Sequence, residues 1–331
     1  MLRVLRHPPR GKMLKGEKEM SVVIFNGERS EESVQFEKLL FSQSNKTSFS
    51  SVENAKQFIE QRATVNNQPY VIGEDVQFLS VKDEQTFEDM QVFTLNDQNS
   101  SKQKVILYIH GGAWTNQPLN LHWLFMDKMA QALQAKIIAP IYPKVPHFNH
   151  KDTYQKMLHL YNRILETVES SSQLTIIGDS AGGNIALGLA QLLKQNHLPQ
   201  PQDIILLSAC VDLSLENPLI PEYEEKDPML ASEGMGVITK IWAADKDLKD
   251  PLISPIYGDF QGLASITHFI GTHESLYPDA VKFDEQLSEQ GIDITTFVYP
   301  KMNHVFVVMP IPEALDAQQK IINIIHSKVL R

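Results

Sequence analysis

The sequence contains a single cysteine, Cys210. One cysteine excludes an intramolecular disulfide and a metal site built from cysteines alone. The chain also lacks an uninterrupted apolar run of about 18 residues, the length needed to span a bilayer. We therefore expect a cytoplasmic protein with no stable membrane insertion. We also expect no metal site, because the sequence has no cluster of histidines or carboxylates with metal-ligand spacing.

Basic residues are also in short supply. The chain has 30 lysines and arginines against 40 aspartates and glutamates, a formal net charge of -10. Nucleic-acid binding normally requires a clustered basic face, so it is not expected here. Residues 1–20 are locally basic, but no apolar segment follows that would make a signal peptide. We expect them to form a disordered tail.

Residues 21–75 have helical character and are expected to form an N-terminal helical segment of a cap. Two helices are predicted, over residues 30–44 and 50–62, and Ser50 with Glu53 fits a capping box for the second.

The rest of the chain, residues 76–331, alternates short β-rich runs with helical patterns. From the third run onward a helical pattern separates each predicted strand from the next, which indicates a mostly parallel sheet covered on both faces. The eight predicted strands are residues 76–81, 90–95, 104–110, 136–142, 174–180, 203–209, 266–272 and 293–300.

About 55 residues separate the sixth and seventh predicted strands, far more than an ordinary connection. This interval is polar at first and then helical. It predicts a helical cap insertion at about residues 213–249.

Ser180 stands where a strand turns directly into a helix, in the sequence GDSAGG. The flanking Gly178 and Gly182 match the G-x-S-x-G nucleophile elbow, in which glycines permit a sharp turn that exposes the serine hydroxyl. Reactive groups of parallel sheets gather beyond the carboxyl ends of the strands, and Ser180 lies at such an end. Ser180 is therefore a candidate nucleophile.

A serine nucleophile requires a base, and the base requires an acid that orients it. His304 follows the last predicted strand, and Glu274 follows the seventh, so both loops open on the same edge as Ser180. Asp279 is the alternative acid, although its place after Pro278 is typical of the first turn of a helix. The order serine, acid, histidine is that of α/β-hydrolases.

The sequence HGGAW, residues 110–114, ends the third predicted strand. Its glycine-rich backbone could supply N–H donors to the oxyanion of an acyl-transfer intermediate. Gly111, Gly112 and Ala181 are the predicted donors.

Together these motifs resemble those of the hormone-sensitive-lipase-like esterases of the α/β-hydrolase superfamily. HGGAW, GDSAGG, GTHESL and KMNHVF stand in the order and spacing of that family's motifs, from about Val76 to the C-terminus. The resemblance implies an α/β-hydrolase fold with an eight-stranded sheet and a helical cap, no cofactor, and a small-molecule ester as partner, with a homodimer left open. It also implies a catalytic triad of Ser180, Glu274 and His304.

Two departures from the family pattern concern the pocket. Ala113 replaces the third glycine of the H-G-G-G motif, and PIYPKVPHF, residues 140–148, stands where the family has Y-R-L-A-P-E. Trp114 and Tyr142 are the residues we expect to line the pocket.

The predicted function is that of a serine carboxylesterase acting on short-chain acyl esters. Two alternatives share these residues. One is an amidase or peptidase that uses the same triad, because the triad does not determine the leaving group. The other is a non-catalytic relative that binds a small molecule without turning it over.

Overall fold

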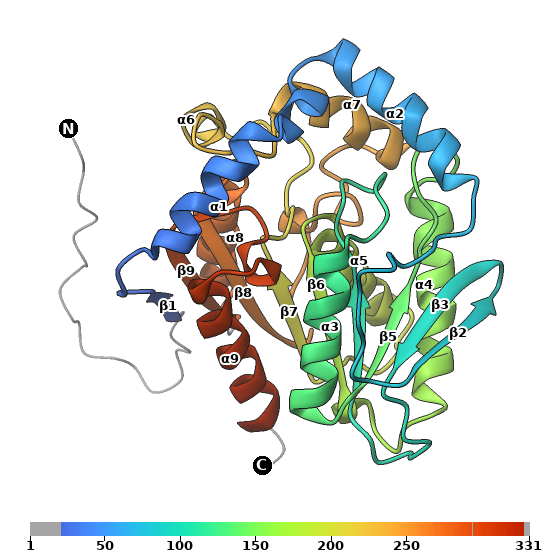
Figure 1. Cartoon of the computed structure of the whole chain (residues 1–331). Coiled ribbons are helices and arrows are strands. Elements are labelled where there is room, and N and C mark those ends of the chain that lie inside the picture. The colour runs from blue at the N-terminus through green and yellow to red at the C-terminus, as the bar shows by residue number, and fades with distance from the viewer. Residues whose placement is uncertain (1–20, 293, 328–331) are drawn as a thin grey trace.

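Nine strands form one sheet in the order β1–β9–β8–β7–β6–β4–β5–β3–β2 (Figure 1). The computed structural model describes residues 21–292 and 294–327. Neighbouring strands are parallel except where β3 pairs with β2 and with β5. The strands are β1 (Ser21–Ile24), β2 (Lys82–Phe87), β3 (Met90–Leu95), β4 (Val105–Ile109), β5 (Lys136–Pro140), β6 (Leu174–Asp179), β7 (Asp203–Leu207), β8 (Ser265–His273) and β9 (Ile294–Asn303).

The two edges of the sheet differ from the predicted eight strands. Residues 76–81 form a loop rather than a strand, and Leu79 and Val81 are 84% and 79% exposed. The edge strand is instead the polar β2, whose charged side chains are typical of a protected edge. At the other edge, β1 pairs with β9 in a segment that was predicted to be helical. The remaining seven predicted strands are present.

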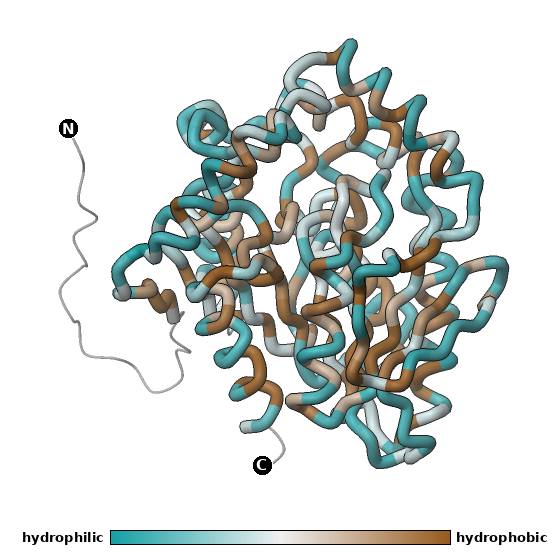
Figure 2. Tube along the Cα trace, viewed as in Figure 1, coloured by the Kyte–Doolittle hydropathy of each residue, from teal (hydrophilic) through white to brown (hydrophobic). Residues whose placement is uncertain are grey.

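The central strands are buried on both faces. Along β4, alternate side chains enter opposite halves of the core: Leu107 joins the half beneath α4 and α5, and Tyr108 joins the half beneath α3 and α9. This pattern is expected when helices cover both faces of a parallel sheet. Figure 2 shows the result as hydrophobic segments along the central strands.

The helices form two layers on the sheet and a third group beside it. The α-helices are α1 (Glu31–Ser42), α2 (Val52–Asn66), α3 (Asn120–Leu133), α4 (His150–Leu165), α5 (Ala181–Gln195), α6 (Ile220–Glu224), α7 (Ser232–Ala243), α8 (Tyr277–Glu289) and α9 (Pro312–Ser327). The 3-10 helices are η1 (Asn45–Phe49), η2 (Ser171–Gln173), η3 (Pro255–Tyr257) and η4 (Phe306–Val308). No helix among the described residues is long and apolar enough to cross a bilayer.

We call α1, α2, α6 and α7 the cap helices. They lie together at one end of the sheet, although α6 and α7 follow α1 and α2 by more than 150 residues in the chain (Figure 1). Helix α2 packs against α7, and the Lys46 ammonium of η1 donates to the carbonyl oxygens of Glu224 and Asp227. Helices from residues 21–75 and from residues 213–249 therefore lie at the same end of the sheet, and their role as a cap stays a prediction.

The second cap helix begins one residue later than its predicted capping box. Ser51, not Ser50, is the N-cap of α2, and its hydroxyl accepts a hydrogen bond from the Asn54 N–H at 3.1 Å. Ser50 instead closes η1, where its N–H bonds to the Thr47 carbonyl.

Candidate active site

Ser180 lies between β6 and α5 with a positive φ of 51°, a backbone conformation that non-glycine residues seldom adopt. The neighbouring glycines make this turn feasible. A Cβ on Gly182 would lie 1.9 Å from the Ile109 carbonyl oxygen, and one on Gly178 would lie 2.4 Å from the Gly182 carbonyl oxygen. Strain at such a position is typical of a nucleophile elbow.

The structure brings the three predicted triad residues together. The Ser180 Oγ lies 2.8 Å from His304 Nε2, and His304 Nδ1 lies 2.7 Å from Glu274 Oε2. The alternative acid, Asp279, lies in the first turn of α8, where it accepts a hydrogen bond from the Asn217 amide at 2.9 Å. Of the two predicted acids, only Glu274 contacts the histidine.

Electrostatics suit His304 to the role of a base. Its burial alone would lower the pKa, but the hydrogen bond that His304 donates to Glu274 and the negative charges of Glu274, Asp227 and Asp179 outweigh burial and raise the pKa above its usual value. The Glu274 carboxylate can only accept, so it fixes the proton on His304 Nδ1 and leaves Nε2 free to accept the Ser180 proton.

Two residues missed by the sequence analysis support this arrangement. The Ser208 hydroxyl donates to Glu274 Oε1 at 2.8 Å and accepts from the Val305 N–H at 3.0 Å, so it contacts the acid and the residue after the base. Asp227 is fully buried and accepts the N–H of Ser275, next to Glu274, at 2.8 Å. Burial raises the pKa of Asp227. In the sequence, Ser208 is a serine directly after a strand, and Asp227 is an aspartate before a proline. Ordinary turns have the same patterns, so the sequence gives no signal that would identify these two residues.

The glycine loop after β4 places Gly111 beside the Asp179 carboxylate, since a Cβ on Gly111 would lie 2.2 Å from Asp179 Oδ2. Burial raises the pKa of Asp179, but His122, Tyr108 and the Gly111 backbone together outweigh burial and lower it. Gly111 remains a predicted oxyanion donor.

The other two predicted donors lie close to Ser180. Gly112 lines the cavity that contains Ser180. Ala181 is the first residue of α5, where backbone N–H groups have no partner within the helix.

Trp114 and Tyr142 do not line the cavity that contains Ser180, so the structure contradicts their predicted place in the pocket wall. Trp114 is fully buried and stacks on Trp242, with ring centroids 5.6 Å apart. Tyr142 stacks on His110 at 4.5 Å and donates its hydroxyl to the His110 carbonyl at 2.9 Å. Both aromatic rings support the glycine loop from behind.

A cavity of about 660 Å³ opens onto Ser180 and His304. Helices α1 and α2, η1 and the segment between α6 and α7 form one wall, and the glycine loop and the segment after His304 form another. The larger apolar side chains of its lining are Phe36, Leu39, Leu40, Phe49, Phe58, Leu119, Leu121, Met229, Leu230, Val305, Val308 and Met309. Arg62 also lines the cavity and lies over the Phe58 ring at 5.0 Å. The site therefore presents a nucleophile to a predominantly apolar pocket.

Among residues 21–292 and 294–327, no group of three or more histidine, cysteine or acidic side chains is arranged to hold a metal ion.

Comparison with known proteins identifies the family. A family model described as the alpha/beta hydrolase fold matches residues 106–308, more than half of the chain. A relative from Acinetobacter venetianus, named as an esterase, is 29% identical over 222 residues, which cover 66% of this chain and 73% of that protein. The chain belongs to the α/β-hydrolase family.

Solved structures agree. A Staphylococcus aureus protein assigned to the esterases matches with 31% identity and a TM-score of 0.80, over 85% of this chain and 95% of that one. A hormone-sensitive lipase from a metagenome library shares the fold at 22% identity, with a TM-score of 0.76 over 90% of this chain and 98% of that one. The α/β-hydrolase fold that the sequence motifs predict is thereby confirmed.

Proposed function

We propose that this α/β hydrolase cleaves short-chain carboxylic esters through a covalent acyl-enzyme on Ser180. The chain is an ester-hydrolysing enzyme by its family and by its esterase relatives. The observation that supports the residue assignment is the continuous contact from Ser180 through His304 to Glu274, with heavy-atom distances of 2.8 and 2.7 Å. A serine hydroxyl becomes a competent nucleophile when a base at this distance takes its proton.

In the first half of the proposed reaction, His304 Nε2 accepts the Ser180 proton while the serine oxygen attacks the ester carbonyl carbon. The N–H groups of the predicted donors Gly111, Gly112 and Ala181 stabilise the negative oxygen of the tetrahedral intermediate. The intermediate collapses, the alcohol leaves with the proton from His304, and the acyl group stays on Ser180. Glu274 stabilises the imidazolium that forms in between.

In the second half, His304 takes a proton from water, and the resulting hydroxide attacks the acyl-enzyme. Collapse releases the carboxylic acid and returns the proton to Ser180. A protein that only binds a small molecule does not need the complete set of contacts between Ser180, His304 and Glu274. These contacts therefore favour the enzyme over the non-catalytic alternative.

Turnover of p-nitrophenyl acetate and butyrate tests the proposal. The wild-type protein should release p-nitrophenol from both, and Ser180→Ala should lose at least about 10³-fold in kcat/KM because it removes the bond-forming atom. Circular dichroism should show an unchanged fold. Undiminished turnover by Ser180→Ala would refute the assignment of the nucleophile.

A substrate panel tests the proposed substrate class. Acetate and butyrate esters should exceed the dodecanoate ester in kcat/KM, and p-nitroanilides of the same acids should react more slowly than the esters. Faster cleavage of the anilides would identify an amidase instead.

A further inference from the structure

Glu37 of α1 contacts both of the loops that carry the proposed acid and base. Its Oε1 accepts a hydrogen bond from His273 Nδ1 at 2.6 Å and another from Asn303 Nδ2 at 3.0 Å. His273 directly precedes Glu274, and Asn303 directly precedes His304. One carboxylate oxygen therefore joins the residue before the acid to the residue before the base.

The second oxygen of Glu37 pairs with Arg29, which lies just before α1. Arg29 Nη2 is 2.9 Å from Glu37 Oε2, and Arg29 Nε donates to Ser33 Oγ of α1 at 3.1 Å. The side chains of Arg29 and Glu37 are 16% and 15% exposed. Burial raises the pKa of Glu37, but hydrogen bonds from its three partners and the Arg29 charge outweigh burial and lower the pKa to about 2. Glu37 is therefore ionised at neutral pH, and its hydrogen bonds are charge-assisted.

The backbone ladder between β8 and β9 is irregular where these two loops begin. The strands keep one register as far as the pair Gly271 and Tyr299, and the register shifts before His273 faces Asn303. Such an irregularity locally interrupts the backbone hydrogen bonds of a sheet. The contacts of Glu37 connect the two strands at this interruption.

Helix α1 also contributes to the wall of the cavity that contains the nucleophile, through the side chains of Phe36, Leu39 and Leu40. The helix has a separate anchor at its N-terminus. The Ser30 N–H and hydroxyl donate to the two carboxylate oxygens of Glu313 in α9, at 2.7 and 2.8 Å. Loss of the Glu37 contacts should therefore leave α1 in its place.

We propose that Glu37 is a positioning residue for ester cleavage, which holds the loops of the acid and the base at the separation that proton transfer needs. This inference rests on the proposed function, since it takes Glu274 and His304 as the acid and the base. An error of about 1 Å in the position of a catalytic group can lower the rate about 100-fold. Glu37 does not line the cavity at the nucleophile, so it acts through His273 and Asn303.

Kinetics on p-nitrophenyl butyrate test the proposal. Glu37→Ala should lower kcat about tenfold because the two loops lose their common partner, whereas KM should stay within about twofold because α1 keeps its place in the pocket wall. Glu37→Gln keeps the length of the side chain without its charge and should lower kcat about threefold. It carries the test if circular dichroism shows that Glu37→Ala does not fold. An unchanged kcat, with or without a raised KM, would overturn the proposal.

The rate of fluorophosphonate labelling of Ser180 gives a readout that does not depend on the choice of ester. It should fall in parallel with kcat in the Glu37 variants, since labelling needs the same base. Labelling of Glu37→Ala at the wild-type rate would contradict the proposal.

A double-mutant cycle with His273→Ala separates positioning from general destabilisation. Because Glu37 acts in part through His273, Glu37→Ala should lower kcat by less than about threefold in the His273→Ala background. Fully additive losses would show that Glu37 acts elsewhere and would overturn the proposal.

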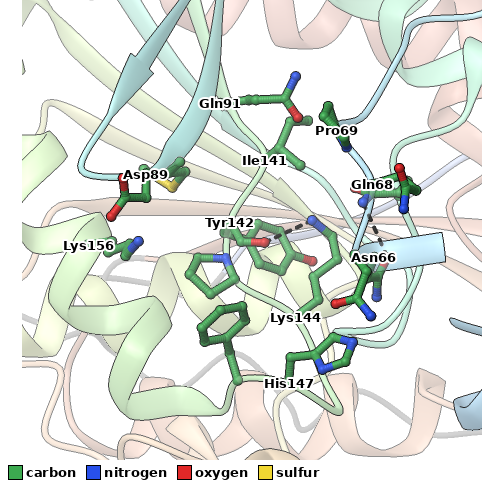
Figure 3. Close-up of a pocket in the computed structure, with 15 residues that line it drawn as sticks. Asn66, Gln68, Pro69, Asp89, Gln91, Ile141, Tyr142, Lys144, His147 and Lys156 are labelled. Atoms are coloured by element: carbon green, nitrogen blue, oxygen red, sulfur yellow. Dashed lines mark hydrogen bonds between the residues drawn. The ribbon is translucent and has the colours of Figure 1, made fainter. Parts of the chain in front are cut away.

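Gln91→Ala is the matched control, because Gln91 also joins two segments of the chain. Its Oε1 accepts the Tyr70 N–H at 2.7 Å, and its Nε2 donates to the Tyr70 carbonyl oxygen at 3.1 Å. Gln91 lies in the wall of another cavity, of about 460 Å³, whose lining does not include Ser180 (Figure 3). Gln91→Ala should keep the wild-type kcat, and equal losses in Gln91→Ala and Glu37→Ala would overturn the proposal. Failure of the proposed function would differ, because Ser180→Ala would then retain turnover.

Discussion

The Ser208 hydroxyl donates to Glu274 Oε1 at 2.8 Å. The same oxygen of Glu274 accepts the Gly271 N–H at 2.8 Å, which leaves its other oxygen directed at His304. Since Ser208 also accepts from the Val305 N–H, one hydroxyl holds both the loop of the acid and the loop of the base. Ser208 is therefore a positioning residue for the proposed triad.

Ser208→Ala should lower kcat/KM about tenfold, because it removes one donor to Glu274 and leaves the buried Val305 N–H without its partner. Esterase kinetics on p-nitrophenyl butyrate measure the effect, which should fall mainly on kcat. Ser80→Ala removes another buried serine hydroxyl, one that accepts a hydrogen bond from Gln131 of α3, and should leave kcat unchanged. Equal kinetic losses in both variants would indicate general destabilisation rather than positioning.

The pH dependence of kcat/KM should have an acidic limb set by His304. The base acts only when Nε2 is unprotonated. Because the pKa of His304 is raised above the ordinary histidine value of 6.5, activity should become half-maximal above that pH. Asp227→Asn removes one of the negative charges that raise this pKa, so its limb should move to lower pH. If the acidic limb of Asp227→Asn lies at the same pH as that of the wild type, Asp227 does not contribute to the raised pKa of His304.

Two glycines of α7 have opposite expected responses to alanine. A Cβ on Gly234 would lie 2.4 Å from the Phe49 carbonyl oxygen of η1, whereas a Cβ on Gly236 meets nothing within 4 Å. Gly236→Ala should stabilise the fold by about 0.5–1 kcal/mol, the usual gain in a helix interior. Gly234→Ala should destabilise the fold and disturb the cavity lined by Phe49. Denaturant unfolding measures both, and a stabilising Gly234→Ala would contradict the packing of α7 on η1.

Asp284 should make stability depend on pH. Burial raises its pKa from 3.8 to about 7, so the unfolded state ionises first and stability is lost as the pH rises through that window. Asp284→Asn cannot ionise, so its stability relative to the wild type should grow between those two pH values and then stay constant.

Thermal unfolding at a series of pH values checks the effect of Asp284→Asn. Glu289→Gln, which changes an exposed carboxylate of the same helix, is the control and should follow the wild type throughout. A constant difference between Asp284→Asn and the wild type across the series would show that Asp284 does not titrate in this range.

The sequence was sufficient to place Ser180, Glu274 and His304 on one edge of the sheet, because that inference needs only the ends of three parallel strands. The sequence was insufficient to predict the direction in which a side chain or a backbone N–H group points. Ala113 and Trp114 both have positive φ, 52° and 56°, and this turn sends the Trp114 ring into the core. Likewise, whether the Gly111 N–H is free depends on the position of the Asp179 carboxylate, which no motif specifies.

The sequence also failed to predict the two edge strands of the sheet. Central strands are apolar on both faces and stand out in the sequence, whereas β2 is charged and β1 has four residues. Edge strands of this kind depend on their neighbours for stability, and pairing with β3 and β9 overrides their weak local signal.

The most direct test of the account is covalent labelling of the wild-type protein with a fluorophosphonate, followed by peptide mass spectrometry. The account predicts one adduct, on Ser180, formed in proportion to the loss of esterase activity, and much slower labelling of His304→Ala because the base is missing. An active enzyme that remains unlabelled at Ser180, or that loses activity through an adduct on another residue, would contradict it.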